Sequence, residues 1–183
     1  MTRQRLGIKA RGCGLSSICA VLALVAGIGA FPDVSSAQST PSASRARYSH
    51  ITMAGESMAP ALHNGQVLNI DTQAYRRHAP HRGDIVVFKG TVVGFQNHYL
   101  IKRVIGLPGE RVDVHHHSVF INGHRLSEPY VRVPAMYFFL PHRVPRAAYF
   151  VLGDNRNNSE DSHLFGWVPA HDIVARVIVP RTK

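Results

Sequence analysis

Two hydrophobic patterns divide the chain. Residues 12–32 contain no charged side chain, and the stretch from Ile18 to Phe31 is almost wholly apolar. After residue 47 the apolar residues come in short runs rich in Val, Ile, Tyr and Phe, and Gly, Pro and Asn separate the runs. Such runs are typical of β-strands, and no long amphipathic helix is visible among them. The pattern predicts strands at residues 66–71, 84–88, 99–105, 111–114, 119–121, 149–152 and 173–179.

Turn-forming residues indicate how some of these strands connect. The dipeptide Asn122-Gly123 is typical of a tight turn, and it predicts a hairpin between Ser118–Ile121 and the segment after His124. Prolines interrupt residues 128–146 around the apolar run Met136–Leu140, which predicts a loop or a small inserted subdomain. We therefore expect residues 48–183 to form a mainly β domain, antiparallel and partly barrel-like.

The apolar segment 12–32 is about long enough to cross a bilayer as one helix. Four basic residues lie between positions 3 and 11, which predicts a cytoplasmic N-terminus for residues 1–11. Residues 33–47 are rich in Ser, Ala and Pro and predict a flexible tether to an exported domain. A secretory signal cut after Ala37 explains the same pattern. Both cysteines fall within the segment, so residues 48–183 have neither a disulfide nor a cysteine-bound metal.

The chain is strongly basic, with a formal net charge of +10 and twelve histidines. This charge favours attraction to an anionic surface. The basic residues are scattered and no nucleic-acid-reading motif accompanies them, so we expect membrane phospholipid rather than nucleic acid as the anionic partner.

Candidate chemistry comes from Ser57, in the run Gly55-Glu56-Ser57-Met58-Ala59-Pro60, and from Lys102, 45 residues later. A serine hydroxyl is a poor nucleophile unless a base takes its proton, and a buried neutral lysine can act as that base. Alternation along a strand places Lys102 on one face with Leu100 and Val104. If that face is buried, the amine is desolvated; if it is wet, Lys102 is a solvated strand lysine. Ser57 alone could equally be a helix N-cap or a turn residue.

A dense polar run from Gly153 to Ser162 completes the pattern. Four segments together make the chain resemble the bacterial type I signal peptidases, which are Ser-Lys dyad serine proteases. They are Ser57-Met58-Ala59-Pro60, Gly83-Asp84-Ile85-Val86-Val87-Phe88, Lys102-Arg103-Val104-Ile105-Gly106-Leu107-Pro108-Gly109, and the Gly153 to Ser162 run continuing into Phe165-Gly166-Trp167-Val168-Pro169. The resemblance implies a β catalytic domain outside the bacterial inner membrane, held by a retained single-pass anchor at residues 12–32. It also implies exported preproteins as substrates, cut after small residues, and no cofactor.

The resemblance also implies roles for single residues. Ser57 is the nucleophile and Lys102 the general base. Ser159 shares a hydrogen bond with Lys102, and Asp161 braces this corner through Arg156. The role of Asp154 is to stabilise its own loop. The backbone N–H of Ser57 is the expected donor to the substrate oxyanion, and Gly55 lets the backbone approach closely, while the second donor stays open. Met58 packs either near the mouth of the site or in the core.

Three positions differ from many relatives of this kind. Gly55 stands where one branch has a serine, Asn157 stands where many have Asp, and His163 stands where many have Arg. These differences bear on the surroundings of the site more than on its chemistry.

Other features have simpler interpretations. The run His115-His116-His117 suggests a metal, but neighbouring strand residues point to opposite faces, which favours a solvated hairpin end. Arg103 points away from Lys102 and is expected to be structural or lipid-facing. Phe138, Phe139 and Leu140 are candidates for contact with the lipid interface. Two alternative functions stay open: a dedicated maturation peptidase of a conjugation system, and a non-enzymatic, membrane-tethered binding module.

Overall fold

The computed structural model describes residues 47–94 and 98–179. The predicted cytoplasmic segment, membrane span and most of the predicted tether lie in residues 1–46, outside the described residues. Within the described ranges, no helix has both the length and the apolar character needed to cross a membrane.

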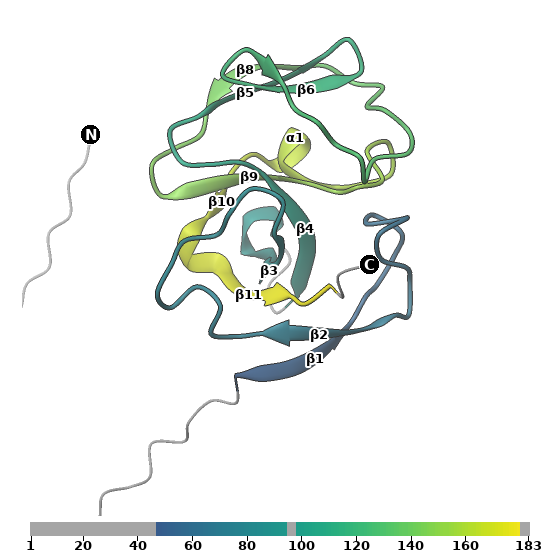
Figure 1. Ribbon diagram of the computed structural model, residues 1–183, viewed down its shortest axis with the longest axis vertical. Helices are drawn as coiled ribbons and strands as arrows, with labels where there is room; N and C mark the ends of the chain where they lie inside the picture. Colours follow the sequence, from purple (N-terminus) through teal and green to yellow (C-terminus); the bar gives the residue numbers. More distant parts are fainter. Residues whose placement is uncertain (1–46, 95–97, 180–183) are drawn as a thin grey trace, which may run out of the picture. The chain divides into compact units, whose positions relative to one another are not determined.

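A seven-stranded sheet forms the larger part of the described chain. Every neighbouring pair of strands in it is antiparallel. Strands β1 and β10 are the two edges, so the antiparallel character is confirmed, but the sheet does not close into a barrel (Figure 1). In order across the sheet, the strands are β1 (Tyr48–Thr52), β2 (Val67–Asp71), β11 (Ile173–Val177), β3 (Ile85–Lys89), β4 (Tyr99–Gly106), β9 (Ala148–Leu152) and β10 (Val168–Pro169).

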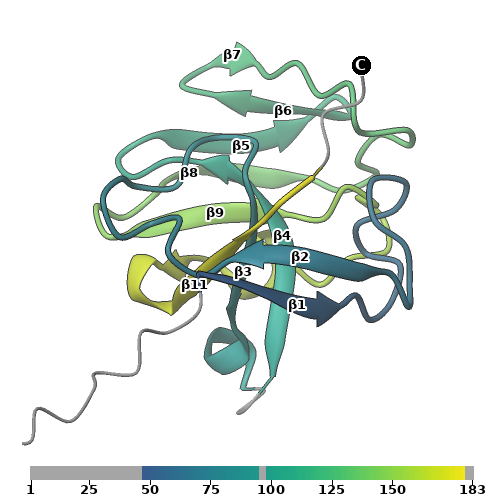
Figure 2. The same ribbon diagram turned by 60° about the horizontal axis from the view of Figure 1, so that its bottom comes forward.

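A four-stranded sheet lies on the side of the folded domain away from β1 (Figure 2). Its order is β7 (His124–Arg125), β6 (Ser118–Ile121), β5 (Arg111–His115) and β8 (Phe139–Arg143). The predicted hairpin is confirmed, because Asn122 and Gly123 turn with positive φ and Ile121 pairs with His124. Three short helices complete the secondary structure of the described ranges: η1 (Gly90–Val93), α1 (Ser162–Phe165) and η2 (Ala170–Asp172).

The inserted region 128–146 contributes a strand that the sequence does not predict. Strand β8 pairs with β5, for example at Val114 opposite Phe139. Its Pro141 lacks a backbone donor, which an edge strand tolerates because one side of it is unpaired. Phe139 is not a lipid-facing residue, since its ring packs 4.9 Å from that of Phe150.

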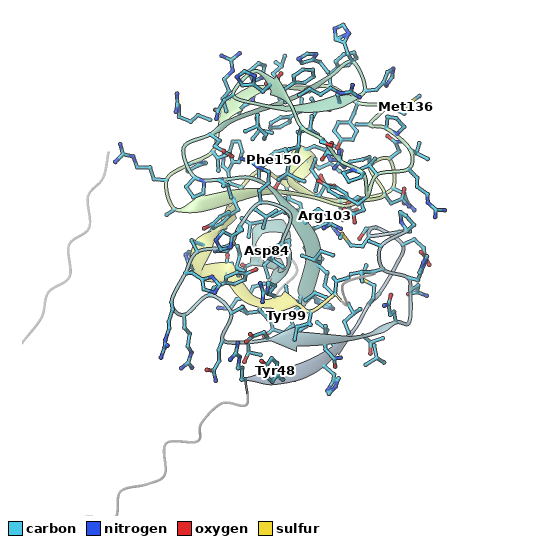
Figure 3. All side chains as sticks on the ribbon, in the orientation of Figure 1. Tyr48, Asp84, Tyr99, Arg103, Met136 and Phe150 are labelled. Atoms are coloured by element: carbon cyan, nitrogen blue, oxygen red, sulfur yellow. The ribbon has the colours of Figure 1, made fainter. Side chains whose placement is uncertain are left out.

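Apolar side chains from both sheets meet in one core cluster. Phe150 on β9 is fully buried and lies between the two sheets (Figure 3), with the Trp167 ring 5.6 Å away. Strand β9 is buried along its whole length and β3 is exposed only at Lys89. These central strands therefore read as continuous apolar runs rather than as alternating ones. Strand β4 runs between them and places Lys102 in the interior.

Candidate active site

Ser57 and Lys102 meet in the structure, although 45 residues separate them. Ser57 lies in the turn after β1, and Lys102 lies in the middle of β4. The Lys102 Nζ atom is 2.8 Å from Ser57 Oγ, which is hydrogen-bond distance. With a neutral amine, the hydroxyl can donate its proton along this contact to the nitrogen lone pair.

The environment of Lys102 favours the neutral amine. The residue is only 4% exposed, so the strand face that carries Lys102 is the buried one. Desolvation lowers the pKa of Lys102 below its usual value, although the charges of Asp161 and Glu160 act in the opposite direction. Among the described residues, no carboxylate forms an ion pair with its ammonium group. A lysine held in this way can give up its proton at a lower pH than a solvated one.

Asn155 anchors the turn that carries Ser57 with two hydrogen bonds. Asn155 donates its backbone N–H to the carbonyl oxygen of Ser57 at 3.1 Å, and its side-chain amide donates to the carbonyl of Glu56 at 3.1 Å. The backbone N–H of Ser57 makes no hydrogen bond within the described residues, so it is available to a substrate oxyanion. Met58 adopts the core alternative, since its side chain is fully buried among apolar residues.

Gly55 has a conformational reason to be glycine. Its φ of +79° is in the left-handed region, and a Cβ there would meet no atom within 4 Å. Its N–H donates to Asn64 Oδ1 at 2.8 Å. Gly55 therefore shapes the turn, and that hydrogen bond already engages its backbone donor.

Gly153, at the start of the Gly153 to Ser162 run, packs closely against the site, and sequence reasoning gave it no role. A Cβ on Gly153 would lie 2.4 Å from the carbonyl oxygen of Ser57 and 2.2 Å from Ser159 Oγ. Only a glycine lets these backbones approach so closely. Its occurrence at the start of the polar run was the available signal, but glycine is common in turns of every kind, so its presence there does not single out a close approach.

Ser159 lies beside Gly153 but does not bond to Lys102, the partner expected for it. Its hydroxyl oxygen is buried and forms no hydrogen bond within the described chain, so the expected bond to Lys102 is absent. The Gly153 contact explains its place: Ser159 packs against the backbone that adjoins Ser57.

Asp161 and Arg156 do not pair with each other, contrary to expectation. Arg156 instead forms two hydrogen bonds with Glu128, of 2.9 and 2.5 Å. Asp161 accepts a hydrogen bond from the Gly153 N–H at 2.9 Å and contacts His163 Nδ1 at 2.6 Å. The reason is the inserted region, which brings Glu128 to the guanidinium of Arg156. Sequence reasoning paired neither Glu128 with Arg156 nor His163 with Asp161.

Asp154 also reaches beyond its own loop. It accepts two hydrogen bonds from Arg103, of 2.8 and 2.6 Å, and its side chain is fully buried. The guanidinium of Arg103 also lies 4.0 Å from the centroid of the Tyr130 ring. Arg103 is thus structural rather than lipid-facing, and it holds β4 to the polar run.

The described residues contain no group of three or more His, Cys, Asp or Glu side chains that could hold a metal. In the histidine run, His116 and His117 form the turn after β5 and have positive φ. His115 stacks on Phe120 with ring centroids 4.0 Å apart. The His115 and His116 rings contact each other edge to face, with centroids 5.0 Å apart, while His117 Nδ1 lies 2.9 Å from the carbonyl oxygen of Ala135.

An alcohol hydrogen-bonded to a desolvated amine, on a mainly antiparallel β framework, is the arrangement that a serine hydrolase with a lysine base requires. Comparison with known proteins agrees with that class. The model of the family described as "Signal peptidase, peptidase S26" matches residues 43–181. The chain belongs to this family.

Named relatives share substantial sequence with the chain. Signal peptidase I of Leptolyngbya laminosa is 46% identical over 129 residues, which cover 68% of this chain and 64% of that protein. Probable signal peptidase I-2 of Synechocystis sp. is 44% identical over 126 residues, which cover 67% of this chain and 58% of that protein. The chain thus spans less than two thirds of the length of these two relatives. A crystal structure of a signal peptidase I from Enterococcus faecalis is 33% identical, with a TM-score of 0.45, and the match covers 55% of this chain and 97% of that one.

Proposed function

We propose that this chain is a membrane-anchored serine endopeptidase that removes N-terminal signal peptides from exported preproteins, with Ser57 as nucleophile and Lys102 as general base. The observation that carries the proposal is the 2.8 Å contact between Ser57 Oγ and a lysine nitrogen that is almost fully buried. Membership of the signal peptidase family supports the choice of reaction and substrate.

The reaction follows from these groups. Neutral Lys102 accepts the Ser57 proton as Oγ attacks the carbonyl carbon of the scissile peptide, and the backbone N–H of Ser57 donates to the oxyanion that forms. Lys102, now an ammonium, returns the proton to the leaving amine as the C–N bond breaks, which leaves an acyl-enzyme. A water molecule then loses a proton to Lys102 and attacks the ester, and Ser57 recovers its proton as the cleaved peptide departs.

The edge strand β1 is a suitable place for the substrate to bind. It pairs on one side with β2, four of its five residues are exposed, and it ends five residues before Ser57. An extended peptide can add to such an edge through main-chain hydrogen bonds. The signal peptide would then run alongside β1 and present its scissile bond at Ser57, with small residues before the cut as the family resemblance implies.

Membrane attachment is part of the same proposal. The uncharged segment 12–32 and the basic residues before it favour a single span with the catalytic domain on the exported side. The side chains of Met136, Phe138 and Leu140 are 72%, 82% and 73% exposed, and we propose that they contact the lipid interface beside the site.

Cleavage of a preprotein by the detergent-solubilised full chain tests the proposal. Ser57→Ala and Lys102→Ala should each lower kcat/KM by at least about a thousandfold, because each removes one half of a unit that acts together. Lys89→Ala is a matched control, since Lys89 is an exposed lysine on the neighbouring strand β3. Thermal unfolding checks that each variant is folded.

Two results would overturn the proposal. A wild-type chain that cleaves no preprotein at any pH would favour a binding module instead. Cleavage that persists in folded Ser57→Ala protein would assign the nucleophile elsewhere.

A further inference from the structure

His163 makes a close contact with a buried carboxylate next to the catalytic pair. Its Nδ1 atom is 2.6 Å from Asp161 Oδ1, and the Asp161 side chain is fully buried. The imidazole also stacks on the ring of Tyr137, with centroids 4.0 Å apart and planes at 13°. Its side chain is 14% exposed, so the ring is fixed in place yet still reaches solvent.

Asp161 connects this imidazole to both catalytic residues. Its Oδ2 atom accepts a hydrogen bond from the Gly153 N–H, and Gly153 packs against the carbonyl of Ser57. Its negative charge also acts on Lys102, where it favours the ammonium form and opposes the effect of burial. A change of charge on His163 therefore changes the electrostatic influence of Asp161 on the amine.

We propose that His163 is a positioning residue whose charge, acting through Asp161, sets how readily Lys102 takes the proton of Ser57. The inference rests on the proposed function. When the imidazole is neutral, the carboxylate keeps its full negative charge and favours the ammonium form of Lys102. When the imidazole is protonated, it offsets that charge and the neutral amine becomes easier to form. The charge of the imidazole thus moderates the loss of activity as pH falls.

Other charged or titratable groups also lie around His163. Burial raises the pKa of Tyr137, so its hydroxyl stays neutral. Arg156 forms an ion pair with Glu128, and Glu160 is an exposed carboxylate. An imidazole is the side chain whose charge ordinarily changes between about pH 5 and 8.

The test is the pH dependence of kcat/KM for preprotein cleavage by the full chain, measured from about pH 5 to 10 for wild type, His163→Arg and His163→Gln. Arginine supplies a permanent cation, so the acidic limb of its profile should move to lower pH by about half a unit or more. Glutamine keeps a hydrogen-bond donor but cannot be protonated, so its activity should fall more steeply than that of wild type below about pH 6.5. The three profiles should converge at alkaline pH, where Lys102 is neutral in all of them.

His124→Arg is the matched control. It adds the same charge on β7, at the outer edge of the four-stranded sheet, and should leave the profile unchanged. A purely structural role for His163 would lower kcat/KM by the same factor at every pH, so parallel profiles for the variants and wild type would overturn the inference.

The wild-type profile provides a test without any substitution. Coupling to His163 predicts an acidic limb whose slope becomes shallower than about one below about pH 6.5. A limb of constant unit slope contradicts the inference, while loss of cleavage in Ser57→Ala still supports the proposed function. Absence of cleavage by wild type at every pH would overturn both.

Discussion

Two neighbouring residues of strand β4, Lys102 and Arg103, have basic side chains in different surroundings. One lies without an ion-pair partner among the described residues, and the other is paired with a carboxylate. In the dyad cluster, defined as Ser57, Lys102 and Ser159, the lysine is buried without a carboxylate in ion-pair range among the described residues. In the ion-pair cluster, defined as Arg103 and Asp154, Arg103 follows Lys102 on the strand and donates two hydrogen bonds to the buried carboxylate of Asp154.

The difference follows from the chemistry of the two cations. A guanidinium stays charged at any ordinary pH, so burying it requires a counter-charge. A lysine amine can instead lose its proton when it is desolvated. The lysine, which has no ion-pair partner among the described residues, is thus available for proton transfer, while the paired arginine serves the fold. Substitutions in the two clusters should therefore affect different properties of the protein.

The largest expected effect on stability is in the ion-pair cluster. Arg103→Met should lower the free energy of unfolding by about 3–5 kcal/mol, because it leaves the buried Asp154 carboxylate without a partner. Urea denaturation measures the loss. The double variant Arg103→Met, Asp154→Leu should recover much of it, since neither charge remains. Equal stability of the single and double variants would contradict the assignment.

Gly153→Ala should affect both stability and cleavage, because Gly153 packs against Ser57 and Ser159 and immediately precedes Asp154 in the chain. The added methyl would lie 2.4 Å from the Ser57 carbonyl oxygen, so this backbone must move. We expect a loss of about 1–3 kcal/mol in the free energy of unfolding and at least about a tenfold loss of kcat/KM. Asn158→Ala, at an exposed position of the same run, is the control. Normal cleavage by Gly153→Ala would show that the close approach is not needed.

The pH dependence of stability should distinguish Lys102 from an ordinary lysine. Its folded pKa lies below the unfolded value of about 10.4, so between these two values the unfolded chain binds one proton more than the folded chain. Stability therefore rises with pH in that window, by about 1.4 kcal/mol per pH unit relative to Lys102→Met. Unfolding free energies of both proteins between about pH 6 and 11 test this. A constant difference between the two proteins would mean that the amine is not desolvated.

Ser159→Ala should have the smallest effect on stability. The hydroxyl is buried and makes no hydrogen bond among the described residues, so its removal should change the free energy of unfolding by less than about 0.5 kcal/mol. A buried hydroxyl without a hydrogen-bond partner is rare in native proteins, and we propose that Ser159 is kept for a role in the reaction. Cleavage should fall by about tenfold or more. Loss of stability with normal cleavage would reverse this interpretation.

The strands that sequence predicted well are those in which composition and burial agree. Strand β9 is buried throughout, and β4 and β5 have buried apolar positions that the residue types already indicate. Strands β1 and β8 were missed because they are exposed edge strands whose residues include Ser, His, Pro and Arg. Their pairing depends on a neighbour in space rather than on their own apolar content.

The sequence by itself determined the β class of the domain, the hairpin at Asn122-Gly123 and the candidate residues Ser57 and Lys102. Only the tertiary structure decided that Lys102 is buried, that Asp161 contacts His163, and that Arg156 belongs to Glu128. The physical reason is that desolvation and the choice of a hydrogen-bond partner depend on segments that lie far apart in the chain. Residue types show what a side chain can do, and packing decides which of those possibilities its surroundings allow.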